Sequence, residues 1–280
     1  MPAMTVSELM GRLDQPGLAI FDCRFLLDAP EACHHDYLRA HVPGAVYVHL
    51  DRDMSAPMTG RNGRHPLPAP EALIATFGRL GISHDTDVVV YDAAGGGLAA
   101  SRLWWTLRYV GHDRVSCLDG GWQAWVAAGG PTVAGEERRA PAQYVGHVRP
   151  DMALDIDATA RAAASPAWCV VDVRAPSRYR GEEEPIDPVA GHIPGARNRF
   201  WQEALTPDGH LRDAAALRRE FEALLGPVPP ERCVFYCGSG VTSAFLVFLM
   251  EYAGLPGARI YPGSWSEWCS DPSRPVATGA

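Results

Sequence analysis

The feature that most constrains the fold is an internal repeat, because the chain carries the same series of short motifs twice. The first half contains "AIFDCR", "AHVPGA", "DVVVYDAAGGG" and "DGGWQAW", and the second half contains "CVVDVR", "GHIPGA", "RCVFYCGSG" and "PGSWSEW" in the same order. Four pairs of positions match, with offsets of 150, 151, 145 and 143 residues: Asp22 with Asp172, His41 with His192, Asp92 with Cys237, and Trp122 with Trp265. Such constant offsets indicate two copies of one domain.

The length and composition agree with two domains. A chain of 280 residues, 47% of them hydrophobic, is long enough for two domains of about 140 residues with a core each. We expect an N-terminal domain over residues 1–135, a linker over 136–147 in the polar stretch "GEERRAPAQ", and a C-terminal domain over 148–280.

Each copy alternates apolar strand-like runs with helical patterns. "DVVVYD" and "RCVFYC" are almost continuously apolar, as strands covered on both faces are. Each run leads into a glycine-rich turn and a helix, predicted over 99–110 and 242–253, that ends at Gly111 or Gly254. A further short helix is predicted over 6–13. The predicted fold class is α/β, with two tandem domains that each hold a mainly parallel sheet flanked by helices.

Charge and cysteine usage narrow the class of protein. The net charge of −8 and the lack of a Lys/Arg run argue against a nucleic-acid partner. The N-terminus lacks the pattern of a signal peptide, and no apolar run has the length of a membrane span. The seven cysteines include no C-x-x-C pair, which favours a reducing cytoplasm and no metal cage. We expect neither a metal nor an organic cofactor.

Cys237 has the setting of a reactive thiol. It follows an apolar strand and precedes Gly238, Ser239, Gly240 and a helix, so backbone N–H groups and the positive helix end converge near its sulfur. A cysteine in this position is expected to have a lowered pKa and to be nucleophilic. The alternative is a small buried residue, as we take Cys117 and Cys169 to be.

The first copy has Asp92 at the position equivalent to Cys237, and aspartate cannot act as a sulfur nucleophile. Only the C-terminal copy is therefore expected to be catalytic.

The D-x-R and H-x-P-G-A signatures, the "DGGW" motif and the single cysteine loop together resemble the rhodanese superfamily, specifically its tandem-domain sulfurtransferases, over nearly the whole chain. The loop "CGSGVT" is similar to that of 3-mercaptopyruvate sulfurtransferases. The resemblance implies that Cys237 takes sulfane sulfur from 3-mercaptopyruvate, or alternatively thiosulfate, and holds it as a persulfide. Cyanide or a thiol, with thioredoxin as a candidate thiol, then accepts the sulfur. The backbone of Gly238, Gly240, Val241 and Thr242 would cradle the anion.

Further site residues are implied by the same resemblance. Arg178 matches the arginine that holds the anionic donor, for which a guanidinium offers two parallel N–H donors. Arg180 is an alternative for this role. Ser239, His65 and Asp53 match a serine, histidine and aspartate that form a proposed proton relay.

One position departs from the family pattern. Mercaptopyruvate enzymes carry a second arginine shortly before "GHIPG", and Ile186 stands at the matching position here. Without a contribution from Arg197 or Arg199, the second cation for the donor carboxylate is missing. The acidic residues Glu182 to Glu184 are expected to face solvent.

Two other functions fit the sequence less well. A cysteine phosphatase needs an arginine that closes the loop, but the sixth residue after Cys237 is Ser243 and the next arginine is Arg259. A non-catalytic interaction module would not need the intact cysteine loop.

Residues that recur in both copies are expected to be structural. This applies to the histidines and aspartates of the repeat, which should hydrogen-bond backbone groups, and to the core tryptophans Trp122, Trp125, Trp265 and Trp268.

Overall fold

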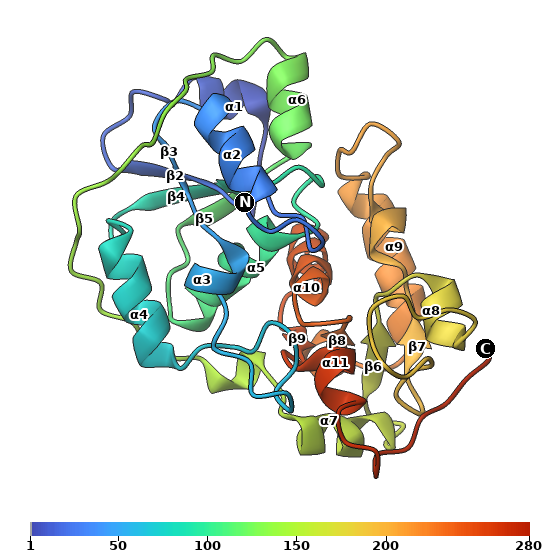
Figure 1. Cartoon of the computed structure of the whole chain (residues 1–280). Helices are drawn as coiled ribbons and strands as arrows, with labels where there is room; N and C mark the ends of the chain where they lie inside the picture. The colour runs from blue at the N-terminus through green and yellow to red at the C-terminus, as the bar shows by residue number, and fades with distance from the viewer. Residues whose placement is uncertain (1) are drawn as a thin grey trace. The chain divides into compact units, whose positions relative to one another are not determined.

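The computed structural model describes residues 2–280, which divide into two compact units (Figure 1). The first unit comprises the chain up to Ser55 together with Pro68–Arg149 and Leu205–Leu211. The second comprises Ala56–Leu67, Pro150–Ala204 and Arg212–Ala280. Each unit thus includes a short segment that lies within the other half of the sequence. The domain boundaries expected near residues 135 and 148 stay a prediction.

The first unit is built on a five-stranded parallel sheet with the strand order β1-β5-β4-β2-β3. Its strands are β1 (Ala3–Met4), β2 (Leu18–Asp22), β3 (Ala45–Tyr47), β4 (Asp87–Tyr91) and β5 (Val115–Leu118). Its helices are α1 (Val6–Met10), α2 (Ala32–Arg39), α3 (Leu50–Asp53), α4 (Pro70–Arg79), α5 (Ala99–Tyr109) and α6 (Gly121–Ala127).

The second unit is built on a four-stranded parallel sheet with the order β7-β6-β8-β9. Its strands are β6 (Cys169–Asp172), β7 (Arg197–Asn198), β8 (Cys233–Tyr236) and β9 (Arg259–Ile260). Its α-helices are α7 (Ile156–Ala163), α8 (Pro176–Arg180), α9 (Ala214–Leu225), α10 (Thr242–Tyr252) and α11 (Ser264–Trp268). Three 3₁₀ turns, η1 (Pro150–Met152), η2 (Trp201–Ala204) and η3 (Pro230–Arg232), complete it.

The predicted fold class is confirmed, and so are the starts of the two helices that follow the loops. Helices α5 and α10 begin at Ala99 and Thr242 as expected and end one residue earlier than expected. Gly111 and Gly254 follow with φ of +93° and +75°, the left-handed conformation that glycine accepts most easily. Helix α1 is shorter than the expected 6–13 because the helix already ends at Gly11.

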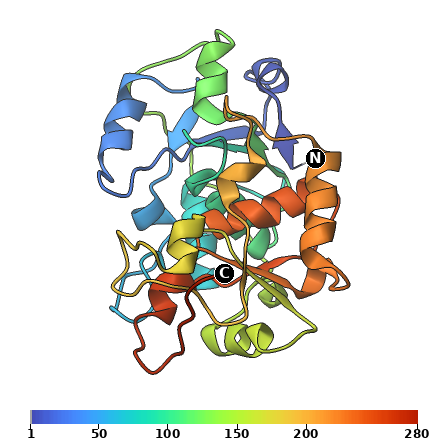
Figure 2. The same ribbon diagram turned by 90° about the vertical axis from the view of Figure 1, so that its right-hand side faces the viewer.

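The core of the second unit forms around its central strand and the helix after it. All four residues of β8 are buried, and in α10 every residue from Ser243 to Met250 is buried. Helices α9 and α10 lie side by side, as Figures 1 and 2 both show. Trp265 and Trp268 belong to this core, while Trp125 and the partly buried Trp122 pack in the core of the first unit. The expected role of the repeated tryptophans is confirmed.

The repeated aspartates hold both backbone and side-chain donors at the ends of β2 and β6. Asp22 accepts the backbone N–H of Arg24 at 3.0 Å, the Arg24 guanidinium at 2.8 Å and the Tyr91 hydroxyl at 2.7 Å. Asp172 accepts the backbone N–H and the guanidinium of Arg174 in the same way, at 2.9 and 2.6 Å. The structural interpretation is confirmed, and the arginine of each D-x-R motif is a buried ion-pair partner that the sequence analysis did not identify.

The repeated histidines also have structural roles. Nδ1 of His41 lies 2.7 Å from the Tyr37 carbonyl oxygen, and Nδ1 of His192 lies 2.7 Å from the Tyr179 carbonyl oxygen. The backbones of His41 and His192 form antiparallel bridges to Val133 and Ala277. Each histidine therefore fixes the turn ahead of a strand, as expected.

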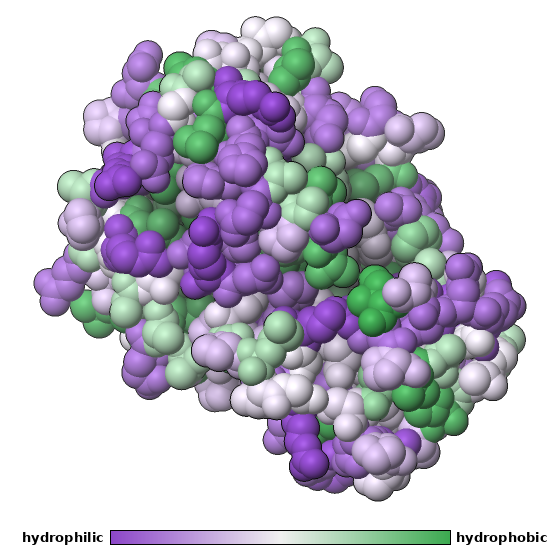
Figure 3. All heavy atoms as spheres, viewed as in Figure 1, coloured by the Kyte–Doolittle hydropathy of each residue, from purple (hydrophilic) through white to green (hydrophobic). Residues whose placement is uncertain are grey.

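On the face drawn in Figure 3, apolar residues are interspersed with hydrophilic ones. Across residues 2–280, no helix combines the length and the apolar character that crossing a bilayer requires.

The buried Asp22–Arg24 pair predicts a large stability effect. In Asp22→Ala, the Arg24 guanidinium and the Tyr91 hydroxyl lose their partner in a dry environment, and we expect the free energy of unfolding to fall by about 3–5 kcal/mol. The matched control is Asp36→Ala, which removes the partner of Arg39 in an exposed ion pair and should cost less than about 1 kcal/mol. Urea unfolding of both variants measures the difference; equal losses would contradict the assignment of a buried pair.

Candidate active site

The Cys237 thiol lies at the carboxyl end of the central strand of the second unit, directly after β8. In a parallel α/β sheet this edge is where ligands bind. Helix α10 begins five residues later, so the peptide N–H groups of its first turn have no partners within the helix. Cys237 as a whole residue is only 3% exposed.

The loop is tightly folded around the sulfur. Gly240 has φ of +77°, and a Cβ at this position would collide with the Pro262 carbonyl oxygen, so a side chain cannot replace glycine without moving the backbone. Its N–H donates to Sγ of Cys237 at 3.1 Å. The loop is held from outside by Trp265 and Ser266, whose N–H groups donate to the carbonyl oxygens of Cys237 and Gly238 at 3.0 and 2.9 Å.

The surroundings of Cys237 favour a thiolate, as the sequence analysis predicts. Burial alone would raise the pKa of the thiol. The Thr242 hydroxyl, the backbone N–H groups of Ser239 and Ser243 and the Ser243 hydroxyl all donate toward the sulfur, and together they lower the pKa of Cys237 below its usual value. The loop therefore presents a nucleophile that is largely ionised at a lower pH than a free cysteine.

The first unit has an equivalent loop in which the carboxyl group of Asp92 takes the position of the sulfur. The carboxylate of Asp92 is fully buried and accepts the N–H groups of Ala94, Gly96, Leu98 and Ala100 at 2.8 to 3.2 Å. Burial raises the pKa of Asp92, and these N–H groups oppose the rise. The comparison indicates that a glycine-rich loop after the central strand is a binding site for one negatively charged group.

Ser239 and His65 meet within the second unit. Nδ1 of His65 lies 2.7 Å from Oγ of Ser239, and both side chains are buried. The segment 56–67, which carries His65, is counted with this unit and closes on itself through a bond from the Ala56 N–H to the Pro66 carbonyl oxygen at 2.9 Å. A serine hydroxyl bonded to an imidazole can pass a proton.

Arg178 lies on α8, close to the loop but already paired. Its Nη2 donates to Oε1 of Glu184 at 2.6 Å, and its Nε lies 3.1 Å from both Glu184 oxygens. Arg180, the alternative for binding the donor, is more exposed and pairs with Glu182.

The expectation that Glu182 to Glu184 all face solvent is wrong for Glu184. Its side chain is 3% exposed and accepts from both Arg174 and Arg178. Burial opposes ionisation, but the Arg178 guanidinium and nearby N–H groups outweigh burial and lower the pKa of Glu184. The two arginines supply enough compensation to keep this carboxylate buried, which a run of three acidic letters did not indicate.

The structure places Arg64 at the loop, a residue that the sequence analysis did not single out. A Cβ built on Gly238 would lie 2.7 Å from Nη2 of Arg64, and 3.7 and 3.8 Å from Nη2 and Nη1 of Arg178. Arg64 also pairs with the buried Asp187, whose pKa is raised by burial although cations lie beside it. The available sequence signal was its position directly before His65.

Ile186 is exposed, and its backbone N–H donates to the same Glu184 oxygen that Arg178 binds. The two other arginines considered for the donor have partners elsewhere in this unit. Arg197 donates to the Leu224 carbonyl oxygen, and Arg199 pairs with Glu203 and Glu220.

Asp53 belongs to the first unit. Its carboxylate accepts from Nη2 of Arg79 at 2.7 Å and from the backbone N–H of His49 at 2.9 Å. Its part in a proton relay stays a prediction.

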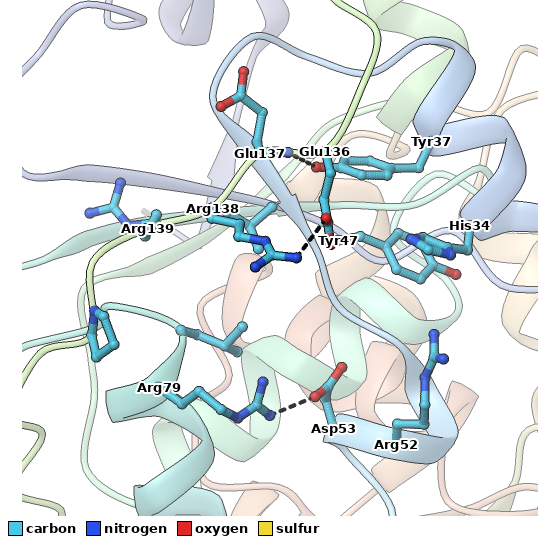
Figure 4. A pocket seen from close by; sticks show the side chains of 13 residues that line it. His34, Tyr37, Tyr47, Arg52, Asp53, Arg79, Glu136, Glu137, Arg138 and Arg139 are labelled. Carbon is cyan, nitrogen blue, oxygen red and sulfur yellow. Dashed lines mark hydrogen bonds and ion pairs between the residues drawn. The ribbon is translucent and has the colours of Figure 1, made fainter.

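A second candidate site is a pocket of about 670 Å³ in the first unit, drawn in Figure 4. It is lined by several arginines, but Arg79 points to Asp53 and Arg138 to Glu136, each within hydrogen-bond distance. The lining contains no cysteine or serine. The pocket therefore lacks a thiol that could carry sulfur, and the cysteine loop is the better candidate for catalysis.

Comparison with known proteins agrees with this choice. The sequence model of the rhodanese-like domain family matches residues 5–128 and 156–271 of this chain. The chain is 45% identical over 280 residues to a protein of Pseudomonas aeruginosa named "Probable 3-mercaptopyruvate sulfurtransferase", covering 99% of this chain and 98% of that one. It is 33% identical to thiosulfate sulfurtransferase of Bos taurus, covering 90% and 85%. A solved structure, 3-mercaptopyruvate sulfurtransferase from Leishmania major, is similar with a TM-score of 0.83 at 28% identity, covering 95% and 73%.

The hydrogen bonds to Cys237 predict its titration. The rate of alkylation by iodoacetamide should rise with pH through a midpoint below the ~8.5 of an unperturbed cysteine. In Thr242→Val one donor to the thiolate is lost, so the midpoint should move to higher pH. Thr278→Val, at an exposed position near the C-terminus, should leave it unchanged. An unchanged midpoint in Thr242→Val would contradict the proposed stabilisation of the thiolate.

Proposed function

The chain belongs to the rhodanese family of sulfurtransferases, and we propose that it moves sulfane sulfur from 3-mercaptopyruvate through a persulfide on Cys237 to a thiol or cyanide. The observation that carries the proposal is the buried Cys237 sulfur, which accepts the Gly240 N–H and has a lowered pKa. This arrangement suits a sulfur atom that becomes negatively charged, both as the attacking thiolate and as the persulfide that follows.

The first step is attack of the Cys237 thiolate on the sulfur of mercaptopyruvate. An S–S bond forms, the C–S bond of the donor breaks, and its electron pair leaves as the enolate of pyruvate. The enolate needs one proton to become pyruvate. Ser239, with its hydroxyl 2.7 Å from Nδ1 of His65, is the proposed proton donor. Asp53 is retained as a candidate third member of this relay.

In the second step the acceptor attacks the outer sulfur of the persulfide. With cyanide the new S–C bond gives thiocyanate, the S–S bond breaks, and its electron pair returns to Cys237 as the thiolate. A thiol acceptor, such as that of thioredoxin, would leave as a persulfide in the same way. Neither step requires an external oxidant or reductant. In the first step the donor sulfur is oxidised to the level of a persulfide while the carbon that carried it is reduced to the methyl group of pyruvate, and in the second step the outer sulfur is transferred without a further change of oxidation level.

Arg178 is proposed to hold the anionic donor, and the charges around it favour mercaptopyruvate over thiosulfate. Two buried carboxylates, Glu184 and Asp187, already offset the positive charge of Arg178 and Arg64. Thiosulfate carries two negative charges and mercaptopyruvate one carboxylate, so the added repulsion is larger for thiosulfate. Thiosulfate is the alternative donor.

We place this reaction in the cytoplasm and expect neither nucleic-acid nor membrane partners. Support comes from the seven cysteines, which are all free thiols in the structure, and from the reaction itself, which needs Cys237 reduced.

The role of Cys237 predicts the outcome of a serine substitution. In Cys237→Ser, thiocyanate formation should fall to less than about one thousandth of the wild-type rate, since the hydroxyl cannot carry the sulfur. Cys169→Ser is a matched control: a hydrogen bond with Cys233 lowers the pKa of Cys169, but its thiol lies at the start of β6 and not in a loop. Full turnover in Cys237→Ser would exclude the mechanism, and loss of turnover in both variants would point to a folding defect.

The charge argument predicts the donor. With cyanide as acceptor, kcat/KM should be at least about tenfold higher for 3-mercaptopyruvate than for thiosulfate. Steady-state kinetics with each donor at constant ionic strength measures the ratio. A preference for thiosulfate would refute the charge argument, and a lack of turnover with both donors would favour an interaction module.

A further inference from the structure

Two guanidinium groups lie beside the residue that follows the nucleophile. The distances from a Cβ built on Gly238 are 2.7 Å to Nη2 of Arg64 and 3.7 Å to Nη2 of Arg178. A single small group next to Gly238 could therefore contact both arginines. The absence of a side chain at Gly238 allows the Arg64 guanidinium to come this close to the loop.

The same two arginines already share one carboxylate. Asp187 binds Nη1 of Arg64 through Oδ1, and Nη2 of Arg178 lies 3.2 Å from Oδ2. The Asp187 side chain is 3% exposed, so the shared ion pair lies at the inner side of the two guanidiniums. This arrangement fixes the separation and orientation of the two cations before any donor binds.

The backbone of Arg64 is itself held close to the cysteine loop. Its backbone N–H donates to Oγ of Ser266 at 3.1 Å, which holds the segment 56–67 beside α11. At the preceding Gly63 (φ +81°), an added Cβ would lie 2.8 Å from the Gly263 carbonyl oxygen, so the backbones are in close contact. Contacts with Ser266 and Gly263 therefore fix the backbone position of Arg64.

Arg64 retains capacity to bind a ligand. Its side chain is 23% exposed, in contrast to Asp187. Its Nε is buried and has no hydrogen-bond partner among the described residues. A guanidinium offers five N–H donors, and the single pairing with Asp187 does not use them all.

We propose that Arg64 is the second cation for the donor carboxylate, and that it forms with Arg178 a two-arginine clamp in which Asp187 is a positioning residue. The inference rests on the proposed sulfur transfer at Cys237 and adds a specificity-determining residue to it. It also explains how the site could have two cations although Ile186 replaces the second arginine of the family, because the second cation comes from a distant segment of the chain. Arg197 and Arg199 bind Leu224, Glu203 and Glu220, and the atoms nearest to a Cβ built on Gly238 belong to Arg64 and Arg178 instead.

The test compares two alkylating reagents of similar size, anionic iodoacetate and neutral iodoacetamide. Both react with the Cys237 thiolate, so the ratio of their rates reports attraction of a carboxylate and cancels any change in the pKa of the thiol. In Arg64→Gln the ratio of iodoacetate to iodoacetamide rates should fall about tenfold, because a charged hydrogen-bond donor to the carboxylate is lost. The KM for mercaptopyruvate should rise by a similar factor.

Arg218→Gln is the matched control. It removes an exposed arginine of α9 that pairs with the exposed Glu222 and should change neither the ratio nor the KM. An unchanged rate ratio in folded Arg64→Gln would overturn the proposal and leave Arg64 as a structural partner of Asp187.

If Arg64→Gln fails to fold, Arg64→Lys carries the test, because lysine keeps the charge but lacks the planar fork of donors. The KM for mercaptopyruvate should then rise several-fold, and a wild-type KM would overturn the proposal. The alkylation ratio does not require turnover. If the wild-type protein transferred no sulfur from any donor, the proposed function would fail while the ratio would still show whether Arg64 attracts a carboxylate.

Discussion

The interaction on which the site depends is the convergence of backbone N–H groups on one anion after the central strand of each sheet. In the first unit the anion is the carboxylate of Asp92, which accepts four N–H groups and is completely buried. In the second unit Cys237 takes the corresponding position, and hydrogen bonds from its loop and from α10 lower its pKa despite burial. The residue at this position thus distinguishes a loop that holds its own buried carboxylate from the loop that is proposed to carry a transferable sulfur.

A chain of alternating charges connects the sheet of the second unit to this loop. It runs from Asp172 at the end of β6 through Arg174, Glu184, Arg178 and Asp187 to Arg64. Most of these side chains are buried, so each charge needs its neighbours, and removing one member exposes the next to a costly environment. The D-x-R motif therefore stabilises the end of a strand and also begins the network that positions the arginines proposed to bind the donor.

The sequence was sufficient for the repeat, the α/β fold class, the helix starts at Ala99 and Thr242, and the reactive setting of Cys237, because these depend on local patterns. It was insufficient for Glu184 and Arg64. Burial of Glu184 depends on Arg174 and Arg178, partners that adjacent letters do not reveal. The placement of Arg64 depends on the segment 56–67 packing in the second unit, more than 170 residues before Cys237 in the chain. The resemblance that indicated Arg178 also showed that Ile186 replaces the second arginine of the family. The sequence around Ile186 gives no sign that another segment of the chain could supply this cation.

The central claim is that sulfur is carried on Cys237 alone. The most direct measurement is mass spectrometry of the protein after incubation with 3-mercaptopyruvate in the absence of an acceptor, followed by mapping of the added sulfur among the seven cysteines. The account predicts one additional sulfur atom on the peptide that contains Cys237, and its removal by cyanide. Sulfur on another cysteine, or an unmodified Cys237 in protein that turns over the donor, would contradict it.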